Sequence, residues 1–557
     1  MSFGPEYIRG LAAALNPLFP WRVSRVEGGD SWVALRGSRE WLFFSWGGGT
    51  SGCCRTDDIT VAALKKSATK RAPLFEALKS RLLRGQLLSA RQINRDRVLE
   101  FEARRAVAAG LSVSYFLILE ATEPVANLIL LDEDRKIEEL ARHSSPDQNR
   151  CRTLLPGYVW APPPVFEGPD PETLEGLSFT DVLNLRGVGR PLARAIQRHW
   201  ETQTPEEWLA ALQPAAPGAL CQRLGRYFTF FPIPLPETEV LGPDPLEAAA
   251  FGVTAPLMER SRSRLLKEAH SRLDRAIKAR SRHLDGLLKQ RRNASMADVF
   301  RRKGELLLAK QAEVPPRADQ VVLTDWEGQT LEIALDPHLT PTRNADRYFK
   351  KYRKAQVDPE ALEASIRKLQ SAITELEEQK DLLESLDDPE SLEQAVRDVE
   401  DWLDERKKHL RSGAGKKRRP KRKKEELPPH LRFDCGEFMI LVGLSARGNR
   451  YVTLKQAGPD DLWLHAHELP GAHVIIRGAG GREGLLAERP DILEFAASLA
   501  AAHSKGKNSL SVQVDYTERR YVRSVPGTVA LVTYTNPGTL RALTKPVRPA
   551  DVKEVKP

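Results

Sequence analysis

The spacing of apolar residues changes several times along the chain, and each change predicts a different kind of element. Two continuous apolar runs, 115–119 and 126–131, are typical of buried strands. A helical pattern at 73–83 precedes them. Prolines then gather at 162–164, which favours a domain boundary at that point. We therefore expect a mixed α and β domain over residues 1–170.

Two later segments, 255–312 and 362–403, each carry one apolar stripe on a highly charged background. The second stripe advances in steps of four and three residues, which are heptad positions, and strand formers occupy 321–335 between the two stripes. We expect an antiparallel coiled-coil hairpin with a small tip over residues 255–411. About fifty helical residues at about 1.5 Å each would make an arm about 75 Å long. The stripe residues are Leu266, Leu273, Ile277, Leu284, Leu288, then Leu362, Ile366, Leu369, Ile373, Leu376, Leu383, and after Pro389 Leu392, Val396, Val399 and Leu403.

The last part of the chain, 431–557, alternates short apolar runs with one helical pattern. This mixture predicts a compact α+β domain, so the whole chain is expected to be a multidomain α+β protein. The predicted strands are 438–442, 462–465, 472–476, 510–514 and 529–534, and the predicted helix is 490–503.

Composition narrows the class of protein. The chain has 557 residues, with 85 Lys and Arg against 75 Asp and Glu, and this net charge of +10 mildly favours a polyanionic partner. No apolar stretch approaches the roughly 20 residues that span a bilayer, and residues 1–6 lack the features of a signal peptide. Five scattered cysteines show neither zinc spacing nor a disulfide framework. We expect a cytoplasmic protein with reduced thiols and no membrane partner.

A glycine turn between two short helical patterns marks a second unit, 171–254. Residues 183–196 contain Gly187-Val-Gly189, which is typical of a helix-hairpin-helix. Two glycines let the backbone turn tightly and present N–H groups at a helix start to a phosphate, and Arg186 and Arg190 add charge. The alternative is that the turn only packs two helices together.

A second candidate for phosphate contact is a run in which eight of nine residues are basic. Such a run cannot bury itself, so residues 412–430 are predicted to be a disordered linker. Contact with nucleic-acid phosphate is favoured over a plain solvated surface, and binding would then depend on salt. The basic residues are Lys416, Lys417, Arg418, Arg419, Lys421, Arg422, Lys423 and Lys424.

Aromatic and basic side chains come together at the head of the second arm. Tyr348 and Tyr352 share one helix face, and Lys351 lies beside them. These side chains are suited to stacking on RNA bases and pairing with RNA phosphates. Anchoring of the helix against the tip is an equally good interpretation.

The C-terminal domain adds histidines and a basic loop. His465 and His467 would face the same side of a strand, with His473 following, but no regular Cys or acidic ligand accompanies them. Hydrogen bonding to RNA or backbone, or plain packing, is therefore favoured over metal binding for His465 and His473. The loop residues Lys505, Lys507 and Asn508 are better candidates for phosphate and base contacts.

Several motifs in this order resemble those of the NFACT family, and the resemblance covers almost the whole chain. The family's Asp-Arg motif is similar to Asp96-Arg97, and its Asn-Ala-x-x-Tyr-Phe-Lys-Lys-Tyr signature is similar to residues 344–352. The C-terminal domain adds Asp461-Leu-Trp-Leu-His465, Pro470-Gly-Ala-His473 and Ser504-Lys-Gly-Lys-Asn508. The family opens with Ser-Phe-Asp-Gly, whereas this chain has Gly4 at the acidic position.

The resemblance implies a ribosome-associated quality control factor. Such a protein binds large ribosomal subunits obstructed by peptidyl-tRNA and recruits alanyl-tRNA for untemplated C-terminal alanine tailing. Its partners would be the large subunit, tRNA and rRNA, with Asp96 and Arg97 contacting tRNA, because an Arg fork and an Asp suit base edges and phosphates. A surface ion pair is the alternative role. The chain would be an adaptor without cofactor or catalytic residues, since the ribosome makes the peptide bond.

The resemblance also implies an N-terminal fold similar to formamidopyrimidine-DNA glycosylase, which raises an enzyme alternative. That enzyme uses an N-terminal proline amine as nucleophile, and Ser2 stands at the corresponding place. A nucleic-acid-binding protein without tailing activity is a second alternative. A cell-surface fibronectin-binding adhesin is a third, and it would require export.

Overall fold

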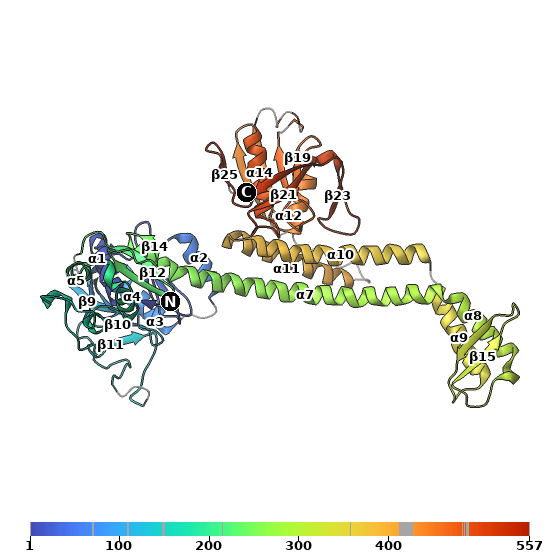
Figure 1. Cartoon of the computed structure of the whole chain (residues 1–557), viewed down its shortest axis with the longest axis horizontal. Coiled ribbons are helices and arrows are strands. Elements are labelled where there is room, and N and C mark those ends of the chain that lie inside the picture. Colours follow the sequence, from blue (N-terminus) through green and yellow to red (C-terminus); the bar gives the residue numbers. More distant parts are fainter. Residues whose placement is uncertain are drawn as a thin grey trace. The chain divides into compact units, whose positions relative to one another are not determined.

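The computed structural model describes residues 2–555 except 69–71, 109–110, 148–150, 214–215, 357, 412–426, 479, 482, 484 and 486–488. The chain divides into two compact units, Met1–Ser263 and Arg264–Pro557 (Figure 1). Each unit contains helices and sheets, which confirms the expected multidomain α+β class. None of the described helices is long and apolar enough to cross a membrane.

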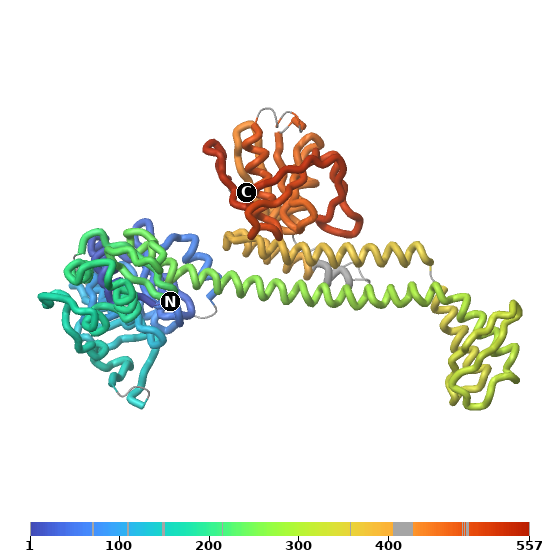
Figure 2. Tube along the Cα trace, viewed as in Figure 1, coloured from blue at the N-terminus to red at the C-terminus, as the bar shows by residue number. Residues whose placement is uncertain are grey.

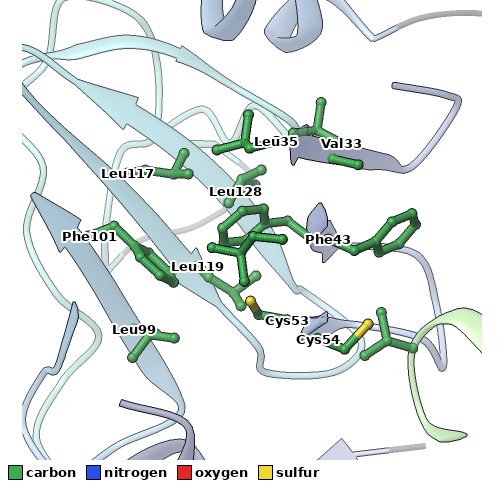
Figure 3. Packing of buried hydrophobic residues seen from close by; sticks show 14 of the residues in the cluster. Val33, Leu35, Phe43, Cys53, Cys54, Leu99, Phe101, Leu117, Leu119 and Leu128 are labelled. Carbon is green, nitrogen blue, oxygen red and sulfur yellow. The ribbon is translucent and has the colours of Figure 1, made fainter. Parts of the chain in front are cut away.

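The core of the first unit lies between two antiparallel sheets. Phe44 of one sheet packs edge-on against Phe101 of the other, with ring centres 5.1 Å apart, and Cys53 and Leu119 belong to the same apolar cluster (Figure 3). The predicted strands at 115–119 and 126–131 are confirmed as parts of β9 and β10. The larger sheet has the order β11 (Ile137–Leu140), β10 (Asn127–Leu131), β9 (Leu111–Glu120), β8 (Val98–Ala108), β7 (Gln86–Gln92), β2 (Trp21–Arg22), and the smaller has β3 (Arg25–Gly28), β4 (Trp32–Arg36), β5 (Trp41–Ser45), β6 (Gly52–Thr56).

A third sheet joins the beginning of the chain to residues more than 200 positions later. Strand β1 (Ser2–Phe3) pairs in parallel with β13 (Tyr227–Phe231). Helix α1 (Pro5–Leu15) begins directly after β1, with a proline in its first turn, and buries Tyr7, Ile8 and Leu11. The remaining elements here are β12 (Leu220–Leu224), β14 (Glu239–Gly242), α2 (Asp58–Ser67), α3 (Pro73–Leu82), α6 (Pro245–Ala248) and the 3-10 turns Asn16–Leu18 and Ala249–Phe251.

The glycine-turn segment of the first unit has its own small core. Leu192 and Ile196 of α4 (Arg190–Arg198) pack with Trp208 of α5 (Pro205–Leu212). The element before the glycines is only the 3-10 helix η3 (Asp181–Asn184), shorter than the helix predicted there. Further 3-10 turns cover Pro171–Thr173 and Trp200–Thr202.

In the second unit, two long helices run antiparallel. Helix α7 (Thr254–Ser295) forms ion pairs with α10 (Pro359–Ser385). The two helices lie side by side (Figures 1 and 2). Moving 17 residues along α7, from Asp274 to Arg291, moves 17 residues back along α10, from Lys380 to Glu363. The two helices therefore keep one register over this length.

The apolar stripe after Pro389 does not continue α10 in a straight line. Helix α10 ends at Ser385, and α11 (Pro389–Arg411) begins after three residues. Arg272 of α7 pairs with Glu400 of α11, although His270 lies beside Glu384 of α10. Helix α11 therefore doubles back beside α10, and its apolar residues bury Leu273 in a three-helix core rather than lengthening the hairpin.

A small tip separates the two long helices in sequence. Helix α8 (Ala297–Ala309) and α9 (Pro341–Ala355) pack on the hairpin of β15 (Gln320–Thr324) and β16 (Thr330–Ala334), which confirms the predicted strands. Asn344 stabilises the entry into α9, because its amide accepts from Asp336 N–H at 2.9 Å and donates to nearby carbonyls. A 3-10 turn, Gln311–Glu313, follows α8.

The C-terminal domain is one sheet covered on both faces. Helix α14 (Pro490–Ala502) packs on the face that carries Leu464 and Val514, while β22 (Val522–Ser524) and β23 (Val532–Tyr534) cover Trp463 on the other. The predicted strands and helix are confirmed. The sheet order is β24 (Gly538–Leu543), β21 (Ser511–Glu518), β19 (Leu462–Ala466), β20 (Val474–Arg477), β18 (Phe438–Gly443), β17 (His430–Cys435), β25 (Lys553–Val555), and α12 (Ala446–Tyr451), a π-helical turn (Val452–Gln456) and a 3-10 turn (Arg519–Tyr521) complete the domain.

Candidate functional site

The predicted Asp-Arg motif lies in the tight turn between β7 and β8. Asn94 and Arg95 both adopt left-handed backbone angles, with φ of 53° and 54°. The amide of Gln92 donates to the carbonyls of Pro5 and Asp96 at 2.7 and 2.8 Å, which ties the turn to the start of α1. Gln92 thus ties the motif to the backbone at the start of α1.

Asp96 and Arg97 are adjacent and partly exposed. The carboxylate of Asp96 accepts from the backbone N–H of Arg97 at 2.7 Å, and the Arg97 Nε lies 3.7 Å from it. Each side chain keeps 33% of its surface exposed. The ion pair is long and reaches the guanidinium through its Nε atom.

A buried carboxyl, Glu6, joins this region to the glycine turn. Its two oxygens accept from the Tyr227 hydroxyl at 2.7 Å and from the Gly189 N–H at 3.0 Å. Burial raises the pKa of Glu6, although both hydrogen bonds work in the opposite direction. Burial likewise raises the pKa of Tyr227, and the nearby Arg97 opposes that shift.

Glu6 of the same unit therefore occupies the N–H group of the glycine turn. The Gly189 N–H, which the sequence predicted to face a phosphate, donates to Glu6 instead. A Cβ at Gly189 would lie 1.6 Å from the Tyr227 hydroxyl, so glycine is needed for this close approach. Within the described residues, the buried Nε of Arg186 has no hydrogen-bond partner, and Arg190 is exposed.

The turn that carries Asp96 and the glycine turn lie against each other. A Cβ at Gly187 would be 3.2 Å from the Arg95 Cβ, and Gly187 has a φ of 79°. Arg95 itself is neutralised, because it pairs with Asp170 and Glu172 at 2.5 Å. The fold thus brings together two groups of predicted residues that stand about ninety positions apart in sequence.

The aromatic residues at the tip have different surroundings. Tyr348 is 93% buried against Phe300, and its hydroxyl donates to the Ala334 carbonyl at 2.8 Å, so it fills the anchoring role. The Lys351 ammonium lies 4.9 Å from the centre of that ring. Tyr352 is only partly buried on the same helix.

The predicted basic loop after α14 is partly neutralised by acidic residues of the long helices. Lys505 pairs with Asp381 at 3.2 Å and keeps 60% of its side chain exposed. Lys507 is largely covered, and it binds Asp387 and the Glu384 carbonyl at 2.8 Å. Asn508 is exposed.

The two predicted histidines of the sheet are uncharged near neutral pH. His465 stacks on Trp463, and burial lowers its pKa to about 4. His473 is buried and hydrogen-bonded to Thr453 at 2.8 Å, and burial lowers its pKa as well. They line a cavity of about 660 Å³ whose far wall carries Glu377, Glu378 and Asp381. An acidic wall and neutral imidazoles disfavour phosphate at this position.

Sequence reasoning did not single out Glu6, although this carboxylate directly follows a glycine-proline pair, and it considered His467 only as a disfavoured metal ligand. Among the residues that the structure describes, no group of His, Cys, Asp and Glu side chains is arranged to hold a metal ion. The predicted basic run, Lys416 to Lys424, lies outside the described residues.

Comparison with known proteins places the chain in a family. The family model for the NFACT N-terminal and middle domains matches residues 33–206 and 254–422, which is more than half of the chain. The chain belongs to the NFACT family. Both stretches of the match include elements described above, the β7–β8 turn with Asp96 and Arg97 in the first and the long helices in the second.

Two relatives share most of the chain's length. The protein named Rqc2 homolog RqcH of Streptococcus suis (strain 05ZYH33) is 29% identical over 493 residues, covering 84% of each chain. The protein of the same name from Bacillus subtilis (strain 168) is 28% identical over 530 residues, covering 86% of this chain and 87% of its own. A solved structure of the C-terminal part of the fibronectin/fibrinogen-binding protein from Streptococcus suis is 25% identical, covers 51% of this chain and 96% of that one, and has a TM-score of 0.31.

Proposed function

We propose that this NFACT protein acts in ribosome-associated quality control. The observation that carries the proposal is the match over more than four fifths of the chain to proteins named Rqc2 homolog RqcH. In this role the chain binds obstructed large ribosomal subunits that hold peptidyl-tRNA and recruits alanyl-tRNA for C-terminal alanine tailing. The protein is a cytoplasmic adaptor, and the ribosome forms the peptide bond.

The proposal gives each domain a task. The N-terminal domain, 1–170, and the helix-hairpin-helix domain, 171–254, hold tRNA. The coiled-coil hairpin, 255–411, spans the subunit surface, and the C-terminal domain, 431–557, contacts rRNA together with the basic linker. The glycosylase-like fold of the first domain serves binding only.

Asp96 and Arg97 are the proposed tRNA contacts. They are supported by their partial exposure and by the turn that presents them, which is fixed through Gln92 and Arg95. A guanidinium can bind a base edge or a phosphate with two parallel hydrogen bonds. A preordered turn lowers the entropy lost on binding.

The test compares two double variants of the full chain. Asp96→Ala with Arg97→Ala should weaken tRNA binding by about tenfold or more, because one specific base contact is worth about 1–3 kcal/mol. The matched control is Arg198→Ala with Glu237→Ala, which removes another exposed ion pair of the same unit, 2.7 Å long. Electrophoretic mobility shift with alanyl-tRNA and with uncharged tRNA measures both.

Sedimentation with purified large subunits is the second measurement. The wild type and both double variants should co-sediment, since the subunit contacts are assigned to the other domains. Failure of the wild type to co-sediment would exclude the proposed function. Unchanged tRNA affinity in the Asp96 and Arg97 double variant would contradict the tRNA contact and show that the two residues form only a structural ion pair.

A further inference from the structure

Asp515 is a buried carboxylate that holds a histidine at the surface of the C-terminal sheet. It accepts from His467 Nδ1, from the Tyr534 hydroxyl and from the Thr539 hydroxyl, each at 2.7 Å. The Asp515 side chain is 3% exposed, whereas that of His467 is 39% exposed. Since Nδ1 faces the carboxylate, the opposite ring nitrogen, Nε2, lies on the other side of the imidazole.

The sheet register places an arginine on the same face as this histidine. The His467 N–H donates to the Gln513 carbonyl at 2.8 Å, and Gln513 pairs with Arg541 across the next strand. Gln513 lies two residues before Asp515 and therefore shares its face of the sheet. Arg541 extends over that face, because its Nε donates to the Ser511 hydroxyl at 2.7 Å.

His467, Gln513 and Arg541 thus form one polar row across three neighbouring chain segments. Two interstrand spacings of about 4.8 Å put the backbones of His467 and Arg541 about 10 Å apart. Gln513 and Arg541 are exposed, and the Gln513 amide between the two basic residues supplies further donors.

The pKa of His467 shifts in the opposite direction from those of His465 and His473. Its carboxylate partner Asp515 raises the pKa of His467, whereas burial lowers the pKa of His465 and His473. The groups that face His467 are Asp515 and, through it, the Tyr534 hydroxyl, with Glu468 as the next acidic residue. An imidazolium held in this way is a directed N–H donor with a positive charge.

We propose that the row of His467, Gln513 and Arg541 binds phosphates of an RNA backbone, with Asp515 as the positioning residue that orients His467. This inference rests on the proposed function, because it specifies how the C-terminal domain contacts RNA. Two basic groups and an amide in line suit a polyanion better than a single ion. The contacts carry no base preference, since they reach only the backbone.

The experiment measures binding of the full chain to a mixed-sequence, unstructured single-stranded RNA by fluorescence anisotropy, at one ionic strength for the pH series and at several salt concentrations at pH 6.5. His467→Gln should weaken binding by about threefold to tenfold at pH 6.5, as expected for one charged hydrogen bond at a surface. It should also reduce the steepness of the salt dependence by about 0.7. His143→Gln is the matched control, because His143 also pairs with an acidic residue, Glu139, at 3.3 Å and lies in the other unit.

The pH profile tests the role of Asp515. Wild-type affinity should fall as the pH rises from 6 to 9, because His467 loses its proton. His467→Gln should abolish this dependence, and Asp515→Asn should move it to lower pH. Arg541→Gln should weaken binding at every pH and keep the profile, since Arg541 does not touch Asp515.

One other group titrates in the same range and needs its own control. Burial raises the pKa of Glu378, across the nearby cavity, to about 7. Glu378→Gln should leave the pH profile in place, and loss of the profile in that variant would overturn the proposal. Equal affinity of His467→Gln and the wild type at all pH values would overturn it as well.

Two further measurements separate the possible failures. Inorganic phosphate at matched ionic strength should compete only weakly with RNA, and strong competition would show a site for a single anion instead. Co-sedimentation with large subunits tests the proposed function independently. If the wild type binds large subunits but the variants of His467 and Arg541 bind RNA as the wild type does, the proposed RNA contact of the row is refuted. The proposed function then stands.

Discussion

Glu6 in the first unit and Asp515 in the second are buried carboxyls that each accept a tyrosine hydroxyl at 2.7 Å. Their other donors differ. Glu6 is completed by the backbone N–H of Gly189, which is neutral, whereas Asp515 is completed by Thr539 and by the basic His467. Accordingly, burial dominates at Glu6 and raises its pKa, while the His467, Tyr534 and Thr539 hydrogen bonds outweigh burial at Asp515 and lower its pKa.

The comparison shows that a shared tyrosine does not decide what a buried carboxyl does. Without a cationic donor, Glu6 acts as a joint that ties the chain's first helix to the glycine turn. With a cationic donor, Asp515 raises the pKa of His467, a side chain at the surface. The first arrangement joins two segments of the chain, and the second orients the imidazole of the proposed RNA-binding row.

The largest expected effect is that of Asp515→Ala. It leaves three donors without their acceptor, each worth about 1 kcal/mol, so the C-terminal domain should lose about 3 kcal/mol of unfolding free energy. Urea unfolding followed by tryptophan fluorescence measures the loss, since Trp463 is fully buried in that domain. A loss below about 1 kcal/mol would mean that the network contributes little to folding.

Gly189→Ala tests the contacts of Glu6 with Gly189 and Tyr227. The added Cβ would meet the Tyr227 hydroxyl at 1.6 Å and displace it from Glu6. We expect a loss of about 2 kcal/mol in the stability of the first unit, as for other overpacked sites. The control is Gly176→Ala, where an added Cβ meets nothing within 4 Å. An equal loss of stability there would show that the clash with Tyr227 is not the cause.

The two carboxyls should respond to pH with opposite signs. The pKa of Glu6 is raised, so its contribution to stability is present in acid and is lost as the pH rises through the folded value. The pKa of Asp515 is lowered, so its contribution is present near neutral pH and is lost as the pH falls through the folded value.

Urea unfolding of Glu6→Gln and Asp515→Asn between pH 3 and pH 8 checks this contrast. Relative to the wild type, Glu6→Gln should become more favourable as the pH rises, and Asp515→Asn less favourable. We expect changes of about 1 kcal/mol. If the stability of both variants relative to the wild type changed with pH in the same direction, the contrast between Glu6 and Asp515 would be wrong.

The smallest effect is expected at Lys505, whose partner Asp381 lies nearer the surface than Asp515. Lys505→Ala should change the unfolding free energy by less than about 0.5 kcal/mol, because exposed ion pairs contribute little. Thermal melting of the full chain measures this. A change comparable to that of Asp515→Ala would show that burial of the carboxylate is not what separates the two sites.

Local pattern determined much of the architecture. Continuous apolar runs predicted β9 and β10, and the helical pattern at 73–83 predicted α3, because each element buries residues at its own period. The same reasoning predicted α14 and the hairpin of β15 and β16. The motifs around Asp96 and residues 344–352 also indicated the NFACT family, which the family match confirms.

Only the tertiary structure decided the reversal of α11, because a heptad stripe looks the same whether a helix continues or doubles back. It also decided the partners of Glu6, since Gly189 and Tyr227 lie 183 and 221 positions away in sequence. The charge of His467 depends on Asp515, which a strand pairing brings alongside, whereas His465 two residues earlier stays neutral. Periodicity reports which face a residue occupies, but the protonation state depends on burial and on the particular donor that another segment supplies.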